Sequence, residues 1–356
     1  MAYRATLTPA TAAHESLVGL WTRNLHNISD AEAKFHWFYL NGPFGEAVAF
    51  LLRCDEGPES DVAVGCAGLG VRHFSYGGQK LSAVLQADLA VDQRHRTALP
   101  ALTLQRTLRR HAQASFDFCY GFPNKHAVAL FVRLGFAQLG RMGRWARVLR
   151  HAPYLRRVVP PRPLGPIVPA VGALLDTIIE GKSLPSRMAA TLKHRLAFVH
   201  KIDDRFDELW ERAHLRYPIL MHRSSAFLRW RYLQKPGEQN FIAALWARRG
   251  GKLDGYAIVR RNQNAAELLD LFTASSADAN DLLTLILPAL RRAGFDSVSM
   301  SYLGAPELPQ LLERHGFALR EQQRTVIVDP GTSSPLAKEL LCNSDNWYIT
   351  DGDEDT

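Results

Sequence analysis

The residues best suited to chemistry lie in a loop that joins a strand-like run, residues 84–91, to a helical pattern that begins near Pro100. The N–H groups at the start of a helix lack partners within the helix and carry partial positive charge, so they attract anions. Proline suits this place because its fixed φ matches a first helical position. Three side chains of the loop can add charge or hydrogen bonds: Arg94, His95 and Arg96. The loop is therefore a candidate phosphate site.

A second basic feature is the interval between Asp117 and Asp176, which contains nine Lys or Arg residues and no Asp or Glu, in a chain of net charge +8. Such an interval attracts an anion, whether a phosphorylated cofactor, an acidic glycan, a lipid headgroup or nucleic acid. An ordinary solvated basic face explains it equally well. A peripheral contact of residues 141–162 with an anionic membrane is one expectation from this charge.

Composition limits the class of protein. The chain has 356 residues, of which 47% are apolar and 22% charged, which suits two globular domains and not a disordered chain. The N-terminus has no basic start before an apolar run, and no stretch of about 18 apolar residues occurs, so we expect neither a secretory signal nor a membrane-spanning helix. The four scattered cysteines and the dispersed histidines lack metal-ligand spacing. These features predict a cytoplasmic protein with reduced thiols and no metal.

One break divides the chain. Residues 151–186 contain seven prolines, which argue against a continuous helix or a central strand. We expect a connector here with a short helix at 171–180, between an N-terminal domain (1–150) and a C-terminal domain (187–330). The remaining residues, 331–356, form a C-terminal extension, and its acidic tail from Asp351 onward is expected to fray.

The two halves resemble each other. Phe-His-Trp-Phe-Tyr-Leu-Asn-Gly-Pro at 35–43 matches Leu-Arg-Trp-Arg-Tyr-Leu-Gln-Lys-Pro at 228–236 in its Trp, Tyr, Leu and Pro. Ala-Asp-Leu at 87–89 is echoed by Leu-Asp-Leu at 269–271, and each half nears its end with Gly-Phe, at 135–136 and 316–317. The offset between matched positions falls only from 193 (230 minus 37) to 181 (316 minus 135). This pattern indicates a duplicated domain and not a short repeat.

Strands and helices alternate in the same order in both halves. After amphipathic helices at 12–25 and 206–214, the predicted strands are 47–53, 63–71 and 84–91 in the first half and 241–247, 255–260 and 267–272 in the second. Each half continues with a helix, a strand and a helix: 100–114, 117–121 and 126–134, then 281–293, 297–302 and 307–315. This order predicts an α/β (α+β layered) fold in each half, a mixed twisted sheet flanked by helices.

Residues 85–136 resemble the GNAT superfamily of acyl-CoA N-acyltransferases, and the duplication implies two tandem GNAT-like domains. The family's pyrophosphate loop has Arg or Gln, two residues, Gly, one residue, then Gly or Ala, and Arg96 and Ala101 stand at the two ends of this pattern. Asn124-x-x-Ala127-x-x-Leu130-Phe131-x-x-Leu134-Gly135-Phe136 is similar to the family's last helix, which an Asn opens and Gly-Phe closes. The resemblance implies acetyl-CoA or another acyl-CoA as donor, bound by Leu89, Ala90, Val91, Arg94, His95, Arg96, Thr97, Ala98, Leu99, Ala101, Asn124, Ala127 and Phe131.

The sequence departs from the family at three places. Thr97 and Leu99 occupy loop positions that usually hold glycine, and side chains there crowd a phosphate. The basic residues of the loop can offset this loss with charge. Phe131 stands where many relatives carry the tyrosine that acts as an acid, and it has no proton to give.

The resemblance also implies catalytic residues. Asp88 lies where many members carry a carboxylate base, although an ordinary polar position on a sheet explains it as well. Tyr120, on the neighbouring strand, is the substitute acid, with His95 and His126 as alternatives. Positioning and an oxyanion-stabilising N–H could also suffice.

The second half lacks the loop pattern. Residues 271–280 contain no cation, so we expect no CoA site there. Its role would be to complete the acceptor site or to stabilise the first half. The predicted substrate contacts are aromatic and basic: Trp37, Tyr39, Arg229, Trp230 and Arg231. Packing of the matched tryptophans explains part of this set equally well.

Together these features predict an acyl-CoA-dependent N- or O-acyltransferase, most simply an acetyltransferase, acting on a small-molecule, sugar or cell-envelope precursor. Two GNAT-like domains, each with a Trp-x-Tyr-x-x-x-Pro element, are similar to bacterial proteins of envelope or polysaccharide biosynthesis. Two alternatives stay open: a non-catalytic binding or regulatory protein on a decayed GNAT fold, and a Fem-type aminoacyl transferase. The last would take its donor from aminoacyl-tRNA, and it is the one case in which a nucleic acid is expected as partner.

Overall fold

The computed structural model describes residues 2–25, 28–55, 62–158, 168–332, 334 and 336–354. Its first half contains the strands β1 (Tyr3–Thr8), β2 (Val48–Cys54), β3 (Ala63–Tyr76), β4 (Gln79–Val91), β5 (Phe118–Gly121) and β6 (Ala137–Val148). The helices of this half are α1 (Ala10–Asn24), α2 (Ala31–Phe35), the π-helical η1 (His36–Leu40), the 3-10 turn η2 (Gln93–His95), α3 (Ala98–Ser115) and α4 (Val128–Arg133). Helices α5 (Ala152–Val158) and α6 (Val168–Lys193) lead to the second half.

The second half repeats this order. Its strands are β7 (His194–Val199), β8 (Ile219–Met221), β9 (Asn240–Ala247), β10 (Leu253–Asn262), β11 (Ala265–Thr273), β12 (Ser297–Gly304) and β13 (Ala318–Pro330). Its helices are α7 (Asp204–Ala213), η3 (His214–Arg216), α8 (Ser225–Tyr232), α9 (Ser276–Arg292) and α10 (Glu307–Arg314). The C-terminal segment adds α11 (Lys338–Leu341), η4 (Ser344–Asn346), β14 (Trp347–Thr350) and η5 (Asp351–Asp353).

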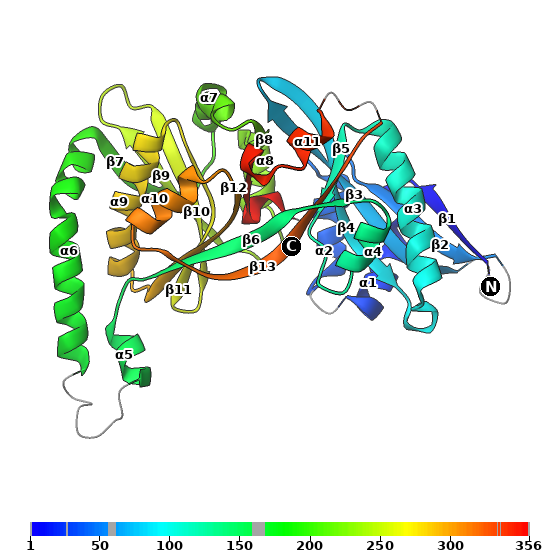
Figure 1. Cartoon of the computed structure of the whole chain (residues 1–356), viewed down its shortest axis with the longest axis horizontal. Helices are drawn as coiled ribbons and strands as arrows, with labels where there is room; N and C mark the ends of the chain where they lie inside the picture. The colour runs from blue at the N-terminus through cyan, green and yellow to red at the C-terminus, as the bar shows by residue number, and fades with distance from the viewer. Residues whose placement is uncertain are drawn as a thin grey trace.

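The two halves share one sheet and exchange their last long strands. The strand order is β1-β2-β3-β4-β5-β13-β6-β12-β11-β10-β9-β7, with β8 and β14 attached beside this path. Strand β13 of the second half pairs antiparallel with β5 of the first, and β6 of the first half pairs antiparallel with β12 of the second. Figure 1 shows β6 and β13 running together across the middle of the molecule. Each half is therefore completed by a strand from the other.

Helix α3 fixes the exchanged strand in the first half. The Arg109 guanidinium donates two hydrogen bonds of 2.8 Å to the Asp329 carboxylate on β13, and Gln113 donates a third of 3.0 Å. Two residues before Asp329 on the same strand, Ile327 is buried with Leu104, Leu108 and Phe131. These residues form the core between the sheet and helices α3 and α4. A bidentate pair whose carboxylate is buried is a strong anchor, so β13 is held by charge as well as by the sheet.

A pair of tryptophans joins the halves. Trp37 on η1 and Trp230 on α8 stack with ring centroids 4.5 Å apart, and each Nε1–H donates to the other's carbonyl oxygen at 2.8 Å. Both are buried. Because η1 and α8 carry the matched Trp and Tyr residues of the two halves, this contact is a nearly symmetric seam between the halves.

Glycine makes room for the aromatic residues of η1. A Cβ on Gly68 would lie 2.1 Å from the Tyr39 hydroxyl oxygen, and one on Gly70 would lie 2.5 Å from the Phe38 ring. These two glycines of β3 let the π-helical turn press its rings onto the sheet. The turn is thereby held at the distance that lets Trp37 reach the second half.

The predicted α/β class and the order of elements are confirmed, with boundaries within a few residues for most predicted elements. Two predictions were wrong. The connector helix is not a short one at 171–180, because α6 runs through Pro185 to Lys193; proline costs one backbone hydrogen bond there but does not end the helix. The acidic tail does not fray over residues 351–354, because Gly352, Asp353 and Glu354 are buried; residues 355 and 356 lie outside the described residues. In the described part of the chain, all helices are too short or not apolar enough to cross a bilayer.

Removing either indole of the tryptophan seam should weaken the whole molecule. Trp37→Ala and Trp230→Ala are each expected to cost about 3–5 kcal/mol in urea unfolding. The double variant should cost less than the sum by roughly 0.5–1.5 kcal/mol, because the ring pair is already lost in either single variant. Trp246→Ala, on β9 next to the edge strand β7, should add to Trp37→Ala without coupling. Additivity of the Trp37 and Trp230 variants would contradict the seam.

Candidate functional site

Strand β4 carries a β-bulge at Asp88. Gly68 of β3 faces Ala87 and Cys66 faces Ala90, so β4 has one extra residue between these pairs. Asp88 accommodates it with φ of 57°, a left-handed conformation that is uncommon outside glycine and occurs more often in aspartate and asparagine. The bulge bends β4 locally, and its pairing with β3 resumes at Ala90 and Val91.

The sheet opens beside this bulge. The parallel pairing of β4 with β5 ends at Gln86 and Gly121, two residues before Asp88. Beyond that point no described strand pairs with this edge of β4. Leu89 and Val91 are half-buried, whereas Ala90 is buried. We call the place where β4 and β5 part, beside the start of α3, the opening of the first half.

The start of α3 presents its first turn to solvent. Thr97 is the N-cap residue, in an extended conformation, and its side chain makes no capping hydrogen bond. Thr97, Ala98 and Leu99 are exposed, while Ala101 is half-buried. The helix has 18 residues, so its dipole places partial positive charge at this turn. This geometry retains the physical basis of the predicted phosphate site although glycines are missing.

Two of the basic residues of the loop, His95 and Arg96, make hydrogen bonds that hold the loop in place, and the third, Arg94, lies on the surface. His95 is buried, and its Nδ1 lies 3.0 Å from the Tyr3 hydroxyl oxygen, so it faces the protein and not the opening. Arg96 donates to the Val91 carbonyl at 3.1 Å and to the Asn24 side-chain oxygen at 2.9 Å. Arg94 is exposed. Arg96 and His95 thus fix the loop that carries the helix start.

The last predicted cofactor residues shape the turn before α4. The Asn124 side-chain oxygen accepts hydrogen bonds of 3.0 Å from the N–H groups of His126 and Ala127. Phe131 is buried against the edge of the Phe136 ring. Gly135 closes the helix with φ of 94°. Asn124 and Gly135 are accounted for by helix geometry, and Asn124 remains exposed at the mouth of the opening.

The two predicted catalytic residues are both hydrogen-bonded. The buried Asp88 carboxylate pairs with the Lys34 ammonium at 2.5 Å and accepts a 3.1 Å hydrogen bond from the Tyr39 hydroxyl. Tyr120 is buried, and its hydroxyl donates to the Asp353 carbonyl oxygen at 3.0 Å. Lys34 was not among the predicted residues, because a lone lysine at a helix end gives no sequence signal.

Most of the predicted substrate-binding residues make contacts with other parts of the protein. Trp37 and Trp230 form the seam between the halves, and Tyr39 holds Asp88. Arg229 donates to the Ile202 carbonyl at 2.8 Å. Arg231 is buried and donates to the carbonyls of Gly352 and Asp351. The fold uses these side chains to join its parts, which agrees with the packing alternative.

The second half also carries a β-bulge, next to the matching aspartate Asp270, in a different setting. Asp270 faces Ile258 of β10 and Leu268 faces Val259, so β11 also has one extra residue, and its parallel pairing with β12 ends at Leu268 and Met300. Here the opening is filled. Strand β14 pairs antiparallel with residues 302–304 of β12, directly beyond the point where β11 and β12 part. The chain's own C-terminal segment lies where the first half is open.

Buried charges hold that segment in place. The Arg223 guanidinium donates to Asp270 at 3.1 Å and to Asp353 at 3.0 Å, and all three side chains are shielded from solvent. Tyr256 donates a 2.9 Å hydrogen bond to the same Asp270. Burial alone would lower the pKa of Arg223, but the two carboxylates raise it well above its usual value; burial raises the pKa of Asp353. Arg324 pairs with Asp351 and Glu354.

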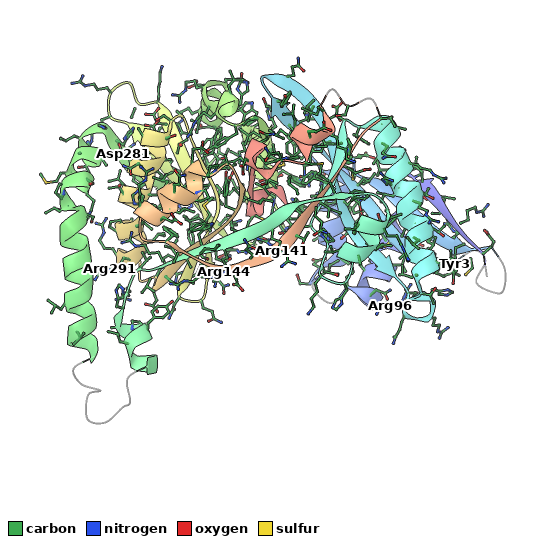
Figure 2. All side chains as sticks on the ribbon, viewed as in Figure 1. Tyr3, Arg96, Arg141, Arg144, Asp281 and Arg291 are labelled. Carbon is green, nitrogen blue, oxygen red and sulfur yellow. The ribbon has the colours of Figure 1, made fainter. Side chains whose placement is uncertain are left out.

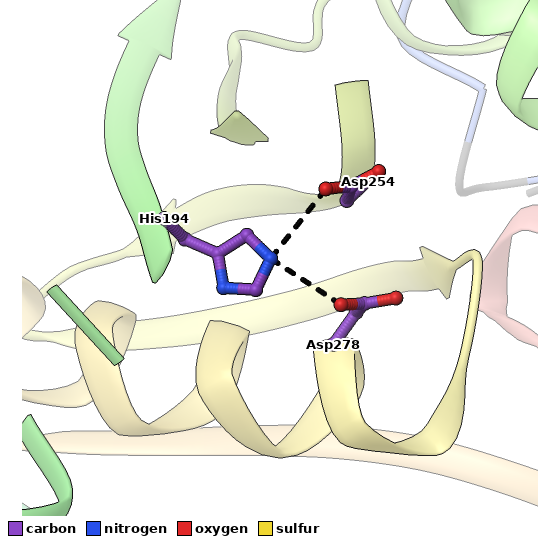
Figure 3. A group of neighbouring side chains, drawn as sticks. All are labelled: His194, Asp254 and Asp278. Atoms are coloured by element: carbon purple, nitrogen blue, oxygen red, sulfur yellow. Dashed lines mark ion pairs between the residues drawn. The ribbon is translucent and has the colours of Figure 1, made fainter. Parts of the chain in front are cut away.

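The protein's own side chains cap the start of α9 and offset the positive charge of its helix dipole. Ser275 caps it, and Asp278 and Asp281 place carboxylates on its first two turns. His194 joins them: its Nε2 lies 3.3 Å from Asp278 and 3.5 Å from Asp254, and its Nδ1 lies 3.2 Å from Asp281. Figure 3 shows His194 between Asp254 and Asp278. These carboxylates leave no place for a phosphate at α9.

The same three side chains, His194, Asp254 and Asp278, are near enough to share a metal ion. They come from three elements that lie far apart in sequence, which is why no spacing signalled them. Arg212 also pairs with Asp254 at 3.2 Å, and the Ser275 hydroxyl donates to Asp278 at 2.6 Å. The group is therefore a satisfied ion-pair cluster of the protein itself.

Comparison with solved structures identifies the fold as that of the GNAT acyltransferases. A conserved protein from Enterococcus faecalis V583, described as a probable N-acyltransferase, aligns at 12% identity and TM-score 0.63 over 93% of this chain and 72% of its own. A GCN5-related N-acetyltransferase from Anabaena variabilis ATCC 29413 aligns at 17% identity and TM-score 0.61, over 91% and 72%. Saccharomyces cerevisiae N-myristoyltransferase with bound myristoyl-CoA aligns at 13% identity and TM-score 0.52, over 92% and 82%.

No protein-family model and no curated protein sequence matches the chain. At these identities the structural likeness shows the fold alone, over 91–93% of this chain.

Removing the central cation of the buried charge network in the second half should lower the free energy of unfolding. Arg223→Met removes the buried cation and leaves two carboxylates together, so we expect a loss of about 3–5 kcal/mol in the free energy of unfolding. Arg205→Met breaks an arginine–aspartate pair that is open to solvent on both sides, so its loss should be much smaller. Equal losses in chemical denaturation would show that the C-terminal segment is not held by this network.

Proposed function

We propose that the first half binds an acyl-CoA and transfers its acyl group to an amine or hydroxyl acceptor. The observation that carries this proposal is the opening at Asp88, where a bulged strand parts from its neighbour beside the exposed first turn of α3. The likeness of the whole chain to GNAT structures supports it. The sealed opening of the second half limits the proposal to one site per chain.

The donor would lie along the opening. Main-chain N–H groups at Ala98 and Leu99 would hold its pyrophosphate, with Arg94 adding charge from the loop. Main-chain groups beyond the bulge, which are not paired with β5, would bind the extended arm of the donor in the manner of an added strand. Asn124 lies at the other side of the same opening.

Asp88 is the proposed proton acceptor. In the reaction, the acceptor's nitrogen or oxygen attacks the thioester carbonyl, the carbon–sulfur bond breaks, and the acceptor's proton passes to a base while the thiolate gains one. The Asp88 carboxylate has a fixed position, set by the bulge, Lys34 and Tyr39. Tyr120 remains the proposed acid, and it would act once its hydrogen bond to the Asp353 carbonyl opens. The acceptor class we propose is a small molecule or glycan precursor.

Leu99 allows a clean test of donor binding. It is 52% exposed on the first turn of α3, where a carboxylate favours the helix but repels a phosphate. Calorimetric titration of acetyl-CoA should show binding to the wild type and at least roughly tenfold weaker binding to Leu99→Glu. Leu215→Glu makes the same change at an exposed leucine of the second half and should bind as the wild type does. No binding to the wild type at millimolar acetyl-CoA would end the proposal.

A non-catalytic acyl-CoA-binding protein is the second candidate, because both Asp88 and Tyr120 already have protein partners. The variant Asp88→Asn distinguishes the catalytic from the non-catalytic candidate. If Asp88 is the base, thiol release from acetyl-CoA with an amine and sugar acceptor panel should fall by about 10²–10⁴-fold while acetyl-CoA binding persists. Absence of turnover by the wild type with every acceptor, despite binding, would favour the non-catalytic candidate.

A further inference from the structure

A basic groove lies at the outer end of the second half. Its volume is about 680 Å³, and it lies between α6, α9, the end of β6 and the end of α10. Six basic side chains line it: Arg147, His151, Arg291, Arg314, His315 and Arg320. No Asp or Glu is among its described lining residues. Figure 2 places Arg291 at the opposite end of the molecule from Arg96, which marks the proposed acyl-CoA opening. The groove is therefore separate from that site.

Three arginines of the groove, Arg147, Arg314 and Arg320, have no carboxylate partner among the described residues. Two neighbours of Arg147 along the chain have carboxylate partners: Arg144 pairs with Glu321 at 2.6 Å and Arg150 with Asp296 at 3.8 Å. Half-buried Arg147 instead donates to the His315 carbonyl oxygen at 2.5 Å, and burial lowers its pKa. A partly buried guanidinium without a carboxylate is unfavourable unless an anion accompanies it.

Of the other residues that line the groove, Arg314 and Arg320 add positive charge, whereas His315 does not. Burial, then Arg147 and Arg314, lowers the pKa of His315 to about 4, so this ring is neutral at pH 7 and its Nε2 lies 3.1 Å from the Asn280 side-chain oxygen. The guanidinium groups of Arg314 and Arg320 make no hydrogen bond or ion pair with the described residues and are exposed at the rim. Ser183 and Ser186 of α6 supply hydroxyl groups on the facing wall.

We propose that this groove binds a phosphoryl-bearing anion. Guanidinium groups match phosphate oxygens with paired N–H donors, and the arginines here come from four different elements that face one space. The volume is that of a site for a small organic ligand, with room for more than one phosphate. The phosphate belongs either to a soluble metabolite or to a lipid headgroup. The site goes beyond the proposed acyl transfer and does not depend on it.

The test uses inorganic pyrophosphate and vesicles with the full-length protein at low salt. The informative variant is the pair Arg314→Glu and Arg320→Glu, because both side chains are exposed and no described contact of the fold depends on them. The matched control is Arg106→Glu and Arg110→Glu, two exposed arginines of α3 with the same change in net charge. Leu99→Glu is included to exclude binding at the acyl-CoA opening. Vesicles of phosphatidylcholine with phosphatidylglycerol provide the lipid arm.

We expect pyrophosphate binding that the groove pair weakens by at least roughly tenfold and that added salt also weakens, with the control pair and Leu99→Glu close to the wild type. Vesicle binding lost in the groove pair alone would support the site with a lipid headgroup as its ligand. The proposal is overturned if the groove pair binds both probes as the control pair does, or if the wild type binds neither. Loss of acetyl-CoA binding in Leu99→Glu leaves this result unaffected, so the two proposals fail separately.

Discussion

The exchange of β6 and β13 is the constraint on which the rest of the structure depends. Strand β5, which borders the proposed donor opening, pairs on its other side with β13 from the far end of the chain. The Arg109–Asp329 pair fixes β13 against α3, the helix whose start faces the same opening. The two copies therefore cannot separate without each losing a strand, and the tryptophan seam closes the joint between them. The site in the first half is built by the whole chain.

Asp88 and Asp270 stand at matching positions of the two halves but have different surroundings. In the first half Asp88 pairs with Lys34 and Tyr39 beside an opening. In the second, Asp270 is sealed by Arg223, and Asp353 from the C-terminal segment shares the same guanidinium. A buried pair of this kind contributes less to stability than its geometry suggests, but it specifies where the segment must lie. In the first half β4 thus parts from β5 with no described strand between them, whereas in the second half the C-terminal segment lies at the corresponding place.

The sequence predicted the local elements and the duplication because both depend on short-range periodicity and on matched residues such as Trp37 and Trp230. It did not predict which strands pair, because alternation marks a strand but not its neighbour, so the exchange of β6 and β13 was missed. The tail was misjudged for a related reason: its carboxylates suggest solvent, but Arg223, Arg231 and Arg324 gather around it only in the folded chain. The resemblance alone points to Asp88 as a base, which stays a prediction, whereas Lys34, its ion-pair partner, gives no signal in the sequence.

The central claim is that this chain has one donor site, in the first half, and a closed counterpart in the second. Amide hydrogen exchange with and without saturating acetyl-CoA tests it most directly, because both openings are read in one experiment. The account predicts slower exchange at residues 88–101 and 121–128, and no change at residues 269–281. Slower exchange at 269–281 would contradict the closure of the second half, and no change at 88–101 would contradict the donor site itself.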